Sequence, residues 1–99
     1  MAESRLQHTL DEVKDEGTFL LFLKALAGDR ADEVRKETQR PGSPYGPGAN
    51  GWENWTIEAF LETAAAWGES SKRSPQSYEN PDNLWKRCAH IIYMGKMYE

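Results

Sequence analysis

The 99-residue sequence has a single cysteine, Cys88, and therefore cannot form an internal disulfide. Small secreted domains usually depend on several disulfides, whereas chains in reducing compartments do not. The first residues also lack the basic start and apolar run of an export signal, and no apolar run approaches the ~20 residues that span a bilayer. We therefore expect one soluble, cytoplasmic domain over residues 1–99, without contact to a membrane.

Basic residues are absent from the middle of the chain. The formal net charge is −4, and residues 41–70 hold four carboxylates but no lysine or arginine. Nucleic-acid binding requires a dense basic stripe that neutralises phosphates, and no part of this chain provides one. The acidic middle instead favours a protein partner with a basic surface.

Strand signals are also missing, because no run alternates apolar and polar residues with β-branched enrichment. Apolar residues recur at every third or fourth position, which predicts an all-α bundle. We expect three main helices at about 18–28, 56–68 and 81–97, with one or two short extra helices. A loop rich in proline and glycine separates the first two, since seven of the twelve residues in 40–51 are of these types. Gly28 and Gly68 are the expected ends of two helices.

The helix at 56–68 has the clearest apolar stripe and follows a cap, Thr56. Further capping signals are a capping box from Thr9 to Glu12 and a cap at Asn80 or Asp82. The stripe of the central helix contains Ile57, Phe60, Leu61, Ala64 and Trp67. That of the last helix contains Leu84, Cys88, Ile91, Gly95 and Tyr98, with Lys86, Arg87 and Lys96 facing water. Val34 is a candidate buried residue.

No residue set for catalysis, metal binding or cofactor binding is found. Cys88 and His90 are two positions apart on a predicted helix, so their side chains diverge and cannot form a nucleophile–base pair. We expect Cys88 to be a small core residue. His90 is either a surface, a buried hydrogen-bonding or a site residue. The chain has no clustered metal ligands and no phosphate-binding loop after a strand. We therefore predict no enzyme, no cofactor and no metal.

Four tryptophans, all between residues 52 and 85, are the most unusual feature. They form either a structural cluster that holds the loop to the central helix or an exposed patch with an acidic rim. Glu58 and Glu62 lie on a wet helix face, or they are neutralised by Lys86, Arg87 or a basic partner. The candidate interaction surface consists of Tyr45, Trp52, Glu53, Asn54, Trp55, Glu58 and Glu62.

Several short motifs resemble a family of small, uncharacterised, mainly bacterial proteins. They are Phe19 to Leu23, Trp52-Glu53-Asn54, Phe60-Leu61-Glu62, Ala66-Trp67 and the closing Gly95-Lys96-Met97-Tyr98-Glu99. The Trp-Glu-Asn element before the central helix is the most specific of them. The resemblance implies a compact domain of unknown function and supplies no catalytic residues.

Two functions remain open at this point. The first is a non-enzymatic protein-interaction module that neutralises a basic partner, by analogy with toxin-immunity proteins. The alternative is a small-ligand-binding domain with a tryptophan-lined pocket between helices, reached past the 40–51 loop.

Overall fold

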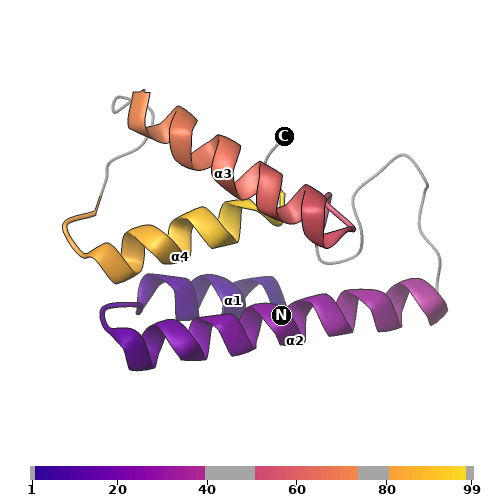
Figure 1. Ribbon diagram of the computed structural model, residues 1–99. Coiled ribbons are helices and arrows are strands. Elements are labelled where there is room, and N and C mark those ends of the chain that lie inside the picture. The colour runs from indigo at the N-terminus through magenta and orange to yellow at the C-terminus, as the bar shows by residue number, and fades with distance from the viewer. Residues whose placement is uncertain (1, 40–50, 74–80, 98–99) are drawn as a thin grey trace.

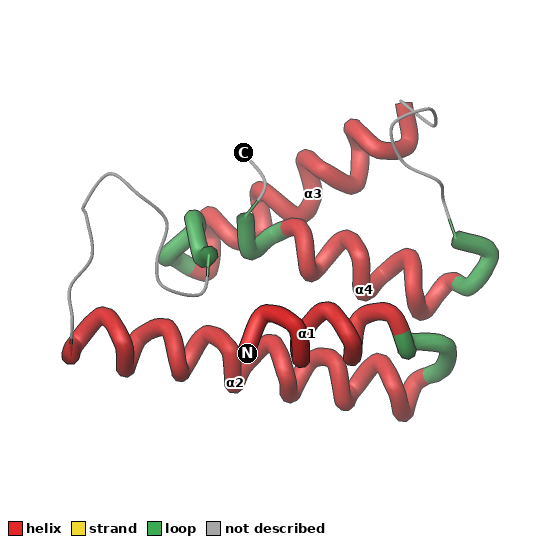
Figure 2. The backbone as a smooth tube through the Cα atoms, turned by 180° about the vertical axis from the view of Figure 1, so that it is seen from behind, coloured by secondary structure: helices red, strands yellow, loops and turns green. Residues whose placement is uncertain are grey.

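Four helices make up the computed structural model, which describes residues 2–39, 51–73 and 81–97, with side chains from residue 5 onward. They are α1 (Ala2–Asp11), α2 (Glu16–Gln39), α3 (Ile57–Arg73) and α4 (Leu84–Met94). The described ranges contain no strand, so the predicted all-α class is confirmed. α1 folds back along α2, α4 packs against both, and α3 packs on the other side of α4 (Figure 1). Figure 2 shows the hairpin of α1 and α2 from behind.

The turn between α1 and α2 is closed by a reciprocal cap. The Asp15 carboxylate accepts the Thr18 N–H at 2.9 Å, and the Thr18 hydroxyl oxygen accepts the Asp15 N–H at 3.0 Å. Bonds to the carboxylate from the Thr18 N–H and then from its hydroxyl lower the pKa of Asp15 below 3.8. The predicted capping box at Thr9 is wrong, because Thr9 lies within α1 and its hydroxyl donates to the Leu6 carbonyl at 2.8 Å.

α2 is one continuous helix of 24 residues and does not end at Gly28. A β-carbon at Gly28 would meet nothing within 4 Å, so this glycine serves no close approach. The helix continues because residues beyond Gly28, notably Asp29 and Glu33, are buried and bonded to the segment before α3. Val34, a candidate core residue, is 47% exposed.

The apolar core lies between the α1–α2 hairpin and α4. Its buried members come from α1 and the residues after it, from α2, from the segment before α3, and from α4. Burying each leucine, valine or phenylalanine among them contributes about 1.5–3 kcal/mol. The residues are Leu6, Leu10, Val13, Phe22, Leu26, Trp52, Ala89 and Tyr93.

The central helix α3 begins after the predicted cap, since the Thr56 hydroxyl accepts the Ala59 N–H at 3.1 Å. It extends beyond Gly68 to Arg73. Gly68 is buried within the helix and lies next to Ile91 of α4, which a β-carbon at this position would meet at 3.6 Å, an ordinary contact distance. The predicted apolar stripe splits: Ala64 is buried, whereas Ile57 and Leu61 are 79% and 58% exposed.

α4 turns a different side to the core from the one predicted. Its cap is Asn83, whose side chain accepts the Lys86 N–H at 3.1 Å, rather than Asp82, and Asn80 lies outside the described residues. The buried residues are Ala89 and Tyr93, whereas Cys88 is exposed and Leu84 is 79% exposed. α4 is packed on two sides, so its apolar stripe is wider than the part that the core covers.

The lysine at the end of α4 is also placed differently from the prediction. Lys96, expected to face water, is fully buried. The two other cations of this region, Lys86 and Arg87, are half-buried.

Candidate functional site

The Trp-Glu-Asn element binds the end of α4 through its backbone and through the Asn54 side chain. The N–H groups of Glu53 and Asn54 donate to the Lys96 carbonyl at 3.0 and 3.4 Å. The Asn54 side-chain amide donates to the Gly95 carbonyl at 2.9 Å. Two motifs that lie more than 40 positions apart are thus direct neighbours. Gly95 is required here, because a β-carbon would lie 2.8 Å from the Phe60 carbonyl oxygen.

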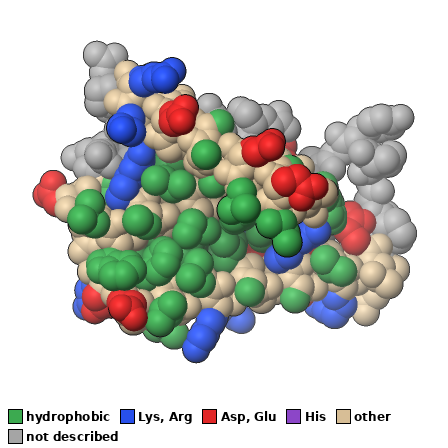
Figure 3. All heavy atoms as spheres, viewed as in Figure 1, with side chains coloured by type: hydrophobic (Ala, Val, Ile, Leu, Met, Phe, Trp, Pro, Cys, Tyr) green, Lys and Arg blue, Asp and Glu red, His purple; other side chains and the backbone are tan. Residues whose placement is uncertain are grey.

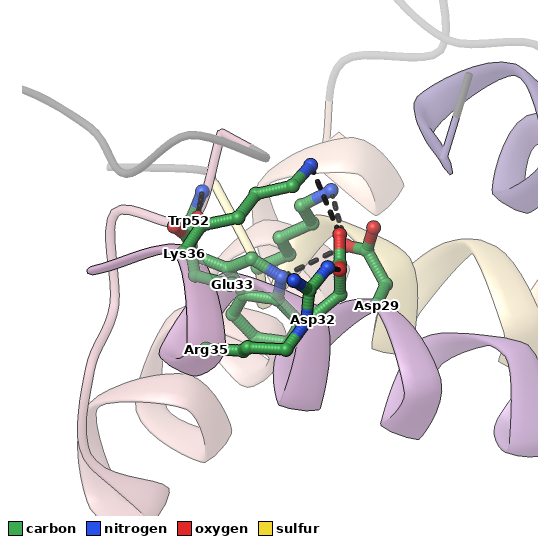
Figure 4. A network of polar contacts seen from close by, with 7 residues as sticks. Asp29, Asp32, Glu33, Arg35, Lys36 and Trp52 are labelled. Carbon is green, nitrogen blue, oxygen red and sulfur yellow. Dashed lines mark hydrogen bonds and ion pairs between the residues drawn. The ribbon is translucent and has the colours of Figure 1, made fainter. Parts of the chain in front are cut away.

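A buried ionic network anchors Trp52 beneath this contact (Figure 4). One carboxylate oxygen of Asp29 accepts both the Trp52 indole N–H and the Lys96 ammonium group, each at 2.8 Å. Glu33, one helical turn further along α2, accepts the Trp52 backbone N–H at 3.3 Å. The Lys96 ammonium group compensates the charge of Asp29, which a buried carboxylate requires. The network therefore fixes the indole of Trp52 against α2.

Arg30 joins this network to the surface. Its guanidinium lies 4.6 Å from the ring centroid of Trp55 and 5.4 Å from that of Trp52, and it donates to the Trp55 carbonyl at 3.3 Å. Such cation–π contacts contribute about 0.5–2 kcal/mol each. Trp52 is buried and stacks on Phe60 at 5.9 Å, whereas Trp55 is 44% exposed. The tryptophan cluster is therefore part core and part surface.

An apolar groove of about 420 Å³ opens beside these two indoles. α2 forms one wall, α3 forms the other, and Ile92 of α4 lies between them. Polar atoms are few, so the groove offers mainly hydrophobic contact. Its lining residues are Leu23, Leu26, Ala27 and Arg30 of α2; Trp52, Asn54, Trp55 and Thr56 of the segment before α3; Ile57, Phe60 and Leu61 of α3; and Ile92 of α4.

Exposed apolar side chains continue from the groove along all three helices. Leu20 of α2 lies three positions before Leu23 of the lining, and Cys88 of α4 lies four positions before Ile92, so helical spacing places them on the same side. Both are exposed, as is Leu84 one further turn back. Figure 3 shows hydrophobic side chains gathered below α3 in one broad patch.

Carboxylates edge this surface on the α3 side (Figure 3). Glu58 and Glu62 are exposed and form no ion pair within the described residues. Lys86 and Arg87, considered above as their neutralising partners, donate instead to the carbonyls of Asp11 at 2.7 Å and Gly68 at 3.0 Å. The two carboxylates therefore remain available to a cation from outside.

The predicted interaction surface is brought together only in part. Trp55, Glu58 and Glu62 lie at the groove or its edge, and Glu53 is exposed. Trp52 and Asn54 line the groove but are mainly held by internal hydrogen bonds. Tyr45 lies outside the described residues.

His90 and Cys88 do not approach a catalytic arrangement. His90 is half-buried, and burial, followed by the positive charge of Lys86, lowers its pKa below 6.5. Cys88 is exposed, and the prediction that it belongs to the core is wrong.

No group of three histidine, cysteine or acidic residues that would suit a metal ion occurs among the described residues. No helix described here is long and apolar enough to cross a bilayer.

A second hollow, of about 520 Å³, lies between α1 and α2. It is lined by charged residues that include Arg5, Asp32, Arg35 and Lys36. Asp32 forms ion pairs with both Arg35 and Lys36, the latter at 3.0 Å. Its charges thus largely neutralise each other, and it carries none of the features that distinguish the apolar groove.

Comparison with known sequences shows the family to which the chain belongs. The sequence profile of a family of unknown function, DUF7660, matches residues 15–99. The chain belongs to this family. The resemblance noted from the Trp-Glu-Asn element to a family of unknown function is thereby confirmed. No curated protein and no solved structure shows significant similarity to the chain.

The range matched by DUF7660 begins at Asp15, the cap of α2, and contains every residue of the groove and of the buried network. α1 lies before it, although Leu6 and Leu10 are buried in the core. Within the matched range, Trp52 and Asn54 line the groove, and the carbonyls of Gly95 and Lys96 accept hydrogen bonds from Asn54.

Sequence reasoning missed the charged members of the site: Asp29, Arg30, Glu33 and Lys96. Asp29 and Glu33 are four residues apart, a spacing that places them on one face of a helix, but the same spacing is common on wet surfaces. Because we expected the helix to end at Gly28, we did not place Asp29 and Glu33 on the same helix as the apolar residues before them. Only the contact with Trp52 and Lys96, distant in sequence, distinguishes them.

Proposed function

We propose that this protein is a non-enzymatic interaction module that binds a basic protein partner in the apolar groove between α2 and α3. The observation that carries the proposal is the exposure of Ile57 and Leu61 beside Trp55 on one wall of that groove. Contiguous exposed apolar surface of this kind marks contact sites in small proteins. A half-exposed tryptophan held by an arginine is also typical of an interface anchor.

The charge of the partner follows from the edge of the groove. Glu58 and Glu62 flank Leu61 on α3 and form no ion pair within the described ranges, and residues 41–70 hold no lysine or arginine. Complementary charge accelerates association and suppresses wrong partners. A basic surface next to an apolar anchor fits this edge, as it would in a protein that neutralises a basic partner.

The test is affinity capture from native lysate with the wild-type protein and two matched variants. Leu61→Gln changes a groove residue, and Leu21→Gln changes a leucine of α2 that is also 58% exposed but does not line the groove. Both substitutions keep net charge and helix propensity nearly constant. We expect a basic protein to be retained by the wild type and by Leu21→Gln, to be lost from Leu61→Gln, and to be released by salt.

Two results would contradict the proposal. One is that no captured protein depends on Leu61. The other is that replacing Glu58 and Glu62 together by lysine leaves the retention and the salt dependence of the captured protein unchanged.

The groove also supports a second function, binding of a small apolar ligand. Its volume of about 420 Å³ and its lining of Trp52, Trp55 and Phe60 lie within the range of small-molecule sites. A thermal-shift screen against a ligand library separates the two. A ligand that stabilises the wild type and Leu21→Gln, but not Leu61→Gln, would favour this alternative.

A further inference from the structure

We infer that the segment which enters the groove is a single amphipathic α-helix with lysine or arginine along its α3-facing edge. This inference rests on the proposed function, since it specifies the form of the protein partner. It follows from three features of the groove: the arrangement of its helices, the spacing of its exposed side chains and the charge of its edge.

The helices leave one side of a bundle open. α3 packs on α4, and α4 packs on α2, but within the described residues α2 and α3 do not pack on each other. α4 lies between α2 and α3 (Figure 1), and its Ile92 forms the floor of the groove that residues of the other two helices wall. Packed helices lie about 8–10 Å apart, so a helix seated between two such walls contacts both of them and the floor at once. It would complete a four-helix arrangement of α2, α3, α4 and itself.

The exposed side chains of the walls follow helical spacing. On α2, the exposed Leu20, the half-buried Leu23 and the exposed Ala27 are separated by three and four positions, and on α3 the exposed Ile57 and Leu61 are separated by four. Rows of this kind form the ridges between which the side chains of another helix are seated. A partner that binds by β-strand addition would instead require a free sheet edge, and the described residues contain no strand.

The carboxylates of α3 determine which side of a bound helix carries positive charge. On α3, Glu58 precedes the groove residue Leu61 by three positions and Glu62 directly follows it. The opposite wall carries Arg30, held between two indoles. A bound helix is therefore expected to present cations toward α3 and none toward Arg30.

Cys88 supplies a probe for occupancy at the floor. It is the only cysteine of the chain, it is exposed, and it lies one helical turn before Ile92 of the groove lining. A helix seated along α4 would cover its thiol. The rate at which N-ethylmaleimide alkylates Cys88 therefore reports on the groove itself, rather than on adhesion to the acidic edge.

The experiment uses the full chain and synthetic peptides of about 18 residues, or five helical turns. One peptide has leucine at helical i, i+3, i+4, i+7 spacing, lysine along one edge of that stripe and glutamine elsewhere. A second has the same composition in scrambled order, and a third has glutamate in place of lysine. We expect the first to slow Cys88 alkylation at least about tenfold at saturation and to gain helical circular dichroism. Leu61→Gln should raise its half-saturating concentration about tenfold, and Leu21→Gln less than about twofold.

Several outcomes would overturn the inference. Equal protection by the scrambled or acidic peptide would show that helical apolar spacing or basic charge is not recognised. Protection that rises with the concentration of the protein alone, and depends on Leu61, would assign the groove to a second copy of the chain. If a native partner is lost from Leu61→Gln while no peptide protects Cys88, the helical form is refuted and the proposed function stands. If neither depends on Leu61, both are refuted.

Discussion

Replacing Lys96 by methionine tests the buried network most directly. The Lys96 side chain is fully buried, and its ammonium group lies 2.8 Å from the Asp29 carboxylate, which is itself 2% exposed. Methionine retains most of the volume and removes the charge. Asp29 would then keep the Trp52 indole as a donor but would lose the cation that compensates its charge.

The expected loss is large for a domain of this size. Removing one partner of a buried ion pair costs about 3–5 kcal/mol, because the remaining charge stays desolvated. Small domains are stable by about 5–15 kcal/mol in total. With an m-value of about 1–1.5 kcal/mol per M, the urea midpoint should fall by about 2–5 M.

The assay is equilibrium urea unfolding followed by tryptophan fluorescence, with Lys24→Met as the control because Lys24 is exposed. The double variant Asp29→Asn/Lys96→Met removes both charges of this ion pair and retains an acceptor for Trp52. It should therefore be more stable than Lys96→Met alone. The reasoning is refuted if Lys96→Met loses less than about 1 kcal/mol, or no more than Lys24→Met.

Two further predictions concern a pair of glycines and a histidine. Gly28→Ala should stabilise the protein by about 0.5–1 kcal/mol, since Gly28 lies within α2 and a β-carbon there would enter open space. Gly95→Ala should instead lower the melting temperature, because its β-carbon would lie 2.8 Å from the Phe60 carbonyl oxygen. Equal effects of the two substitutions in thermal unfolding would contradict this. For His90, burial and then Lys86 lower the folded-state pKa below 6.5, so the unfolded chain binds more protons between the folded pKa and 6.5. Stability is therefore complete above about pH 6.5 and declines as the pH falls through the folded pKa. His90→Gln should remove this part of the decline in melting temperature between about pH 7.5 and 5; an unchanged pH profile would show that another group is responsible.

Periodicity predicted the helical class and the approximate places of α2, α3 and α4, because the spacing of apolar residues depends on local geometry, but it did not predict their ends. The all-α class and the Thr56 cap are confirmed by the structure. Helix ends at Gly28 and Gly68 were wrong, because tertiary contacts of Asp29 and Ile91 override the local preference of glycine. The network around Lys96 was not predictable, since no local signal distinguishes a buried lysine from a wet one.

The errors in the predicted stripes have a common cause. Ile57 and Leu61 of α3, and Leu84 and Cys88 of α4, were assigned to the core because they share a stripe with residues that are packed against a neighbouring helix. In the structure all four are exposed. Each helix thus has more apolar surface than the folded chain covers, and the surplus of α3 and α4 faces the same opening as Leu20 and Leu23 of α2. A sequence that retains apolar side chains on three helices around one opening is consistent with a fourth apolar element that comes from outside the described chain.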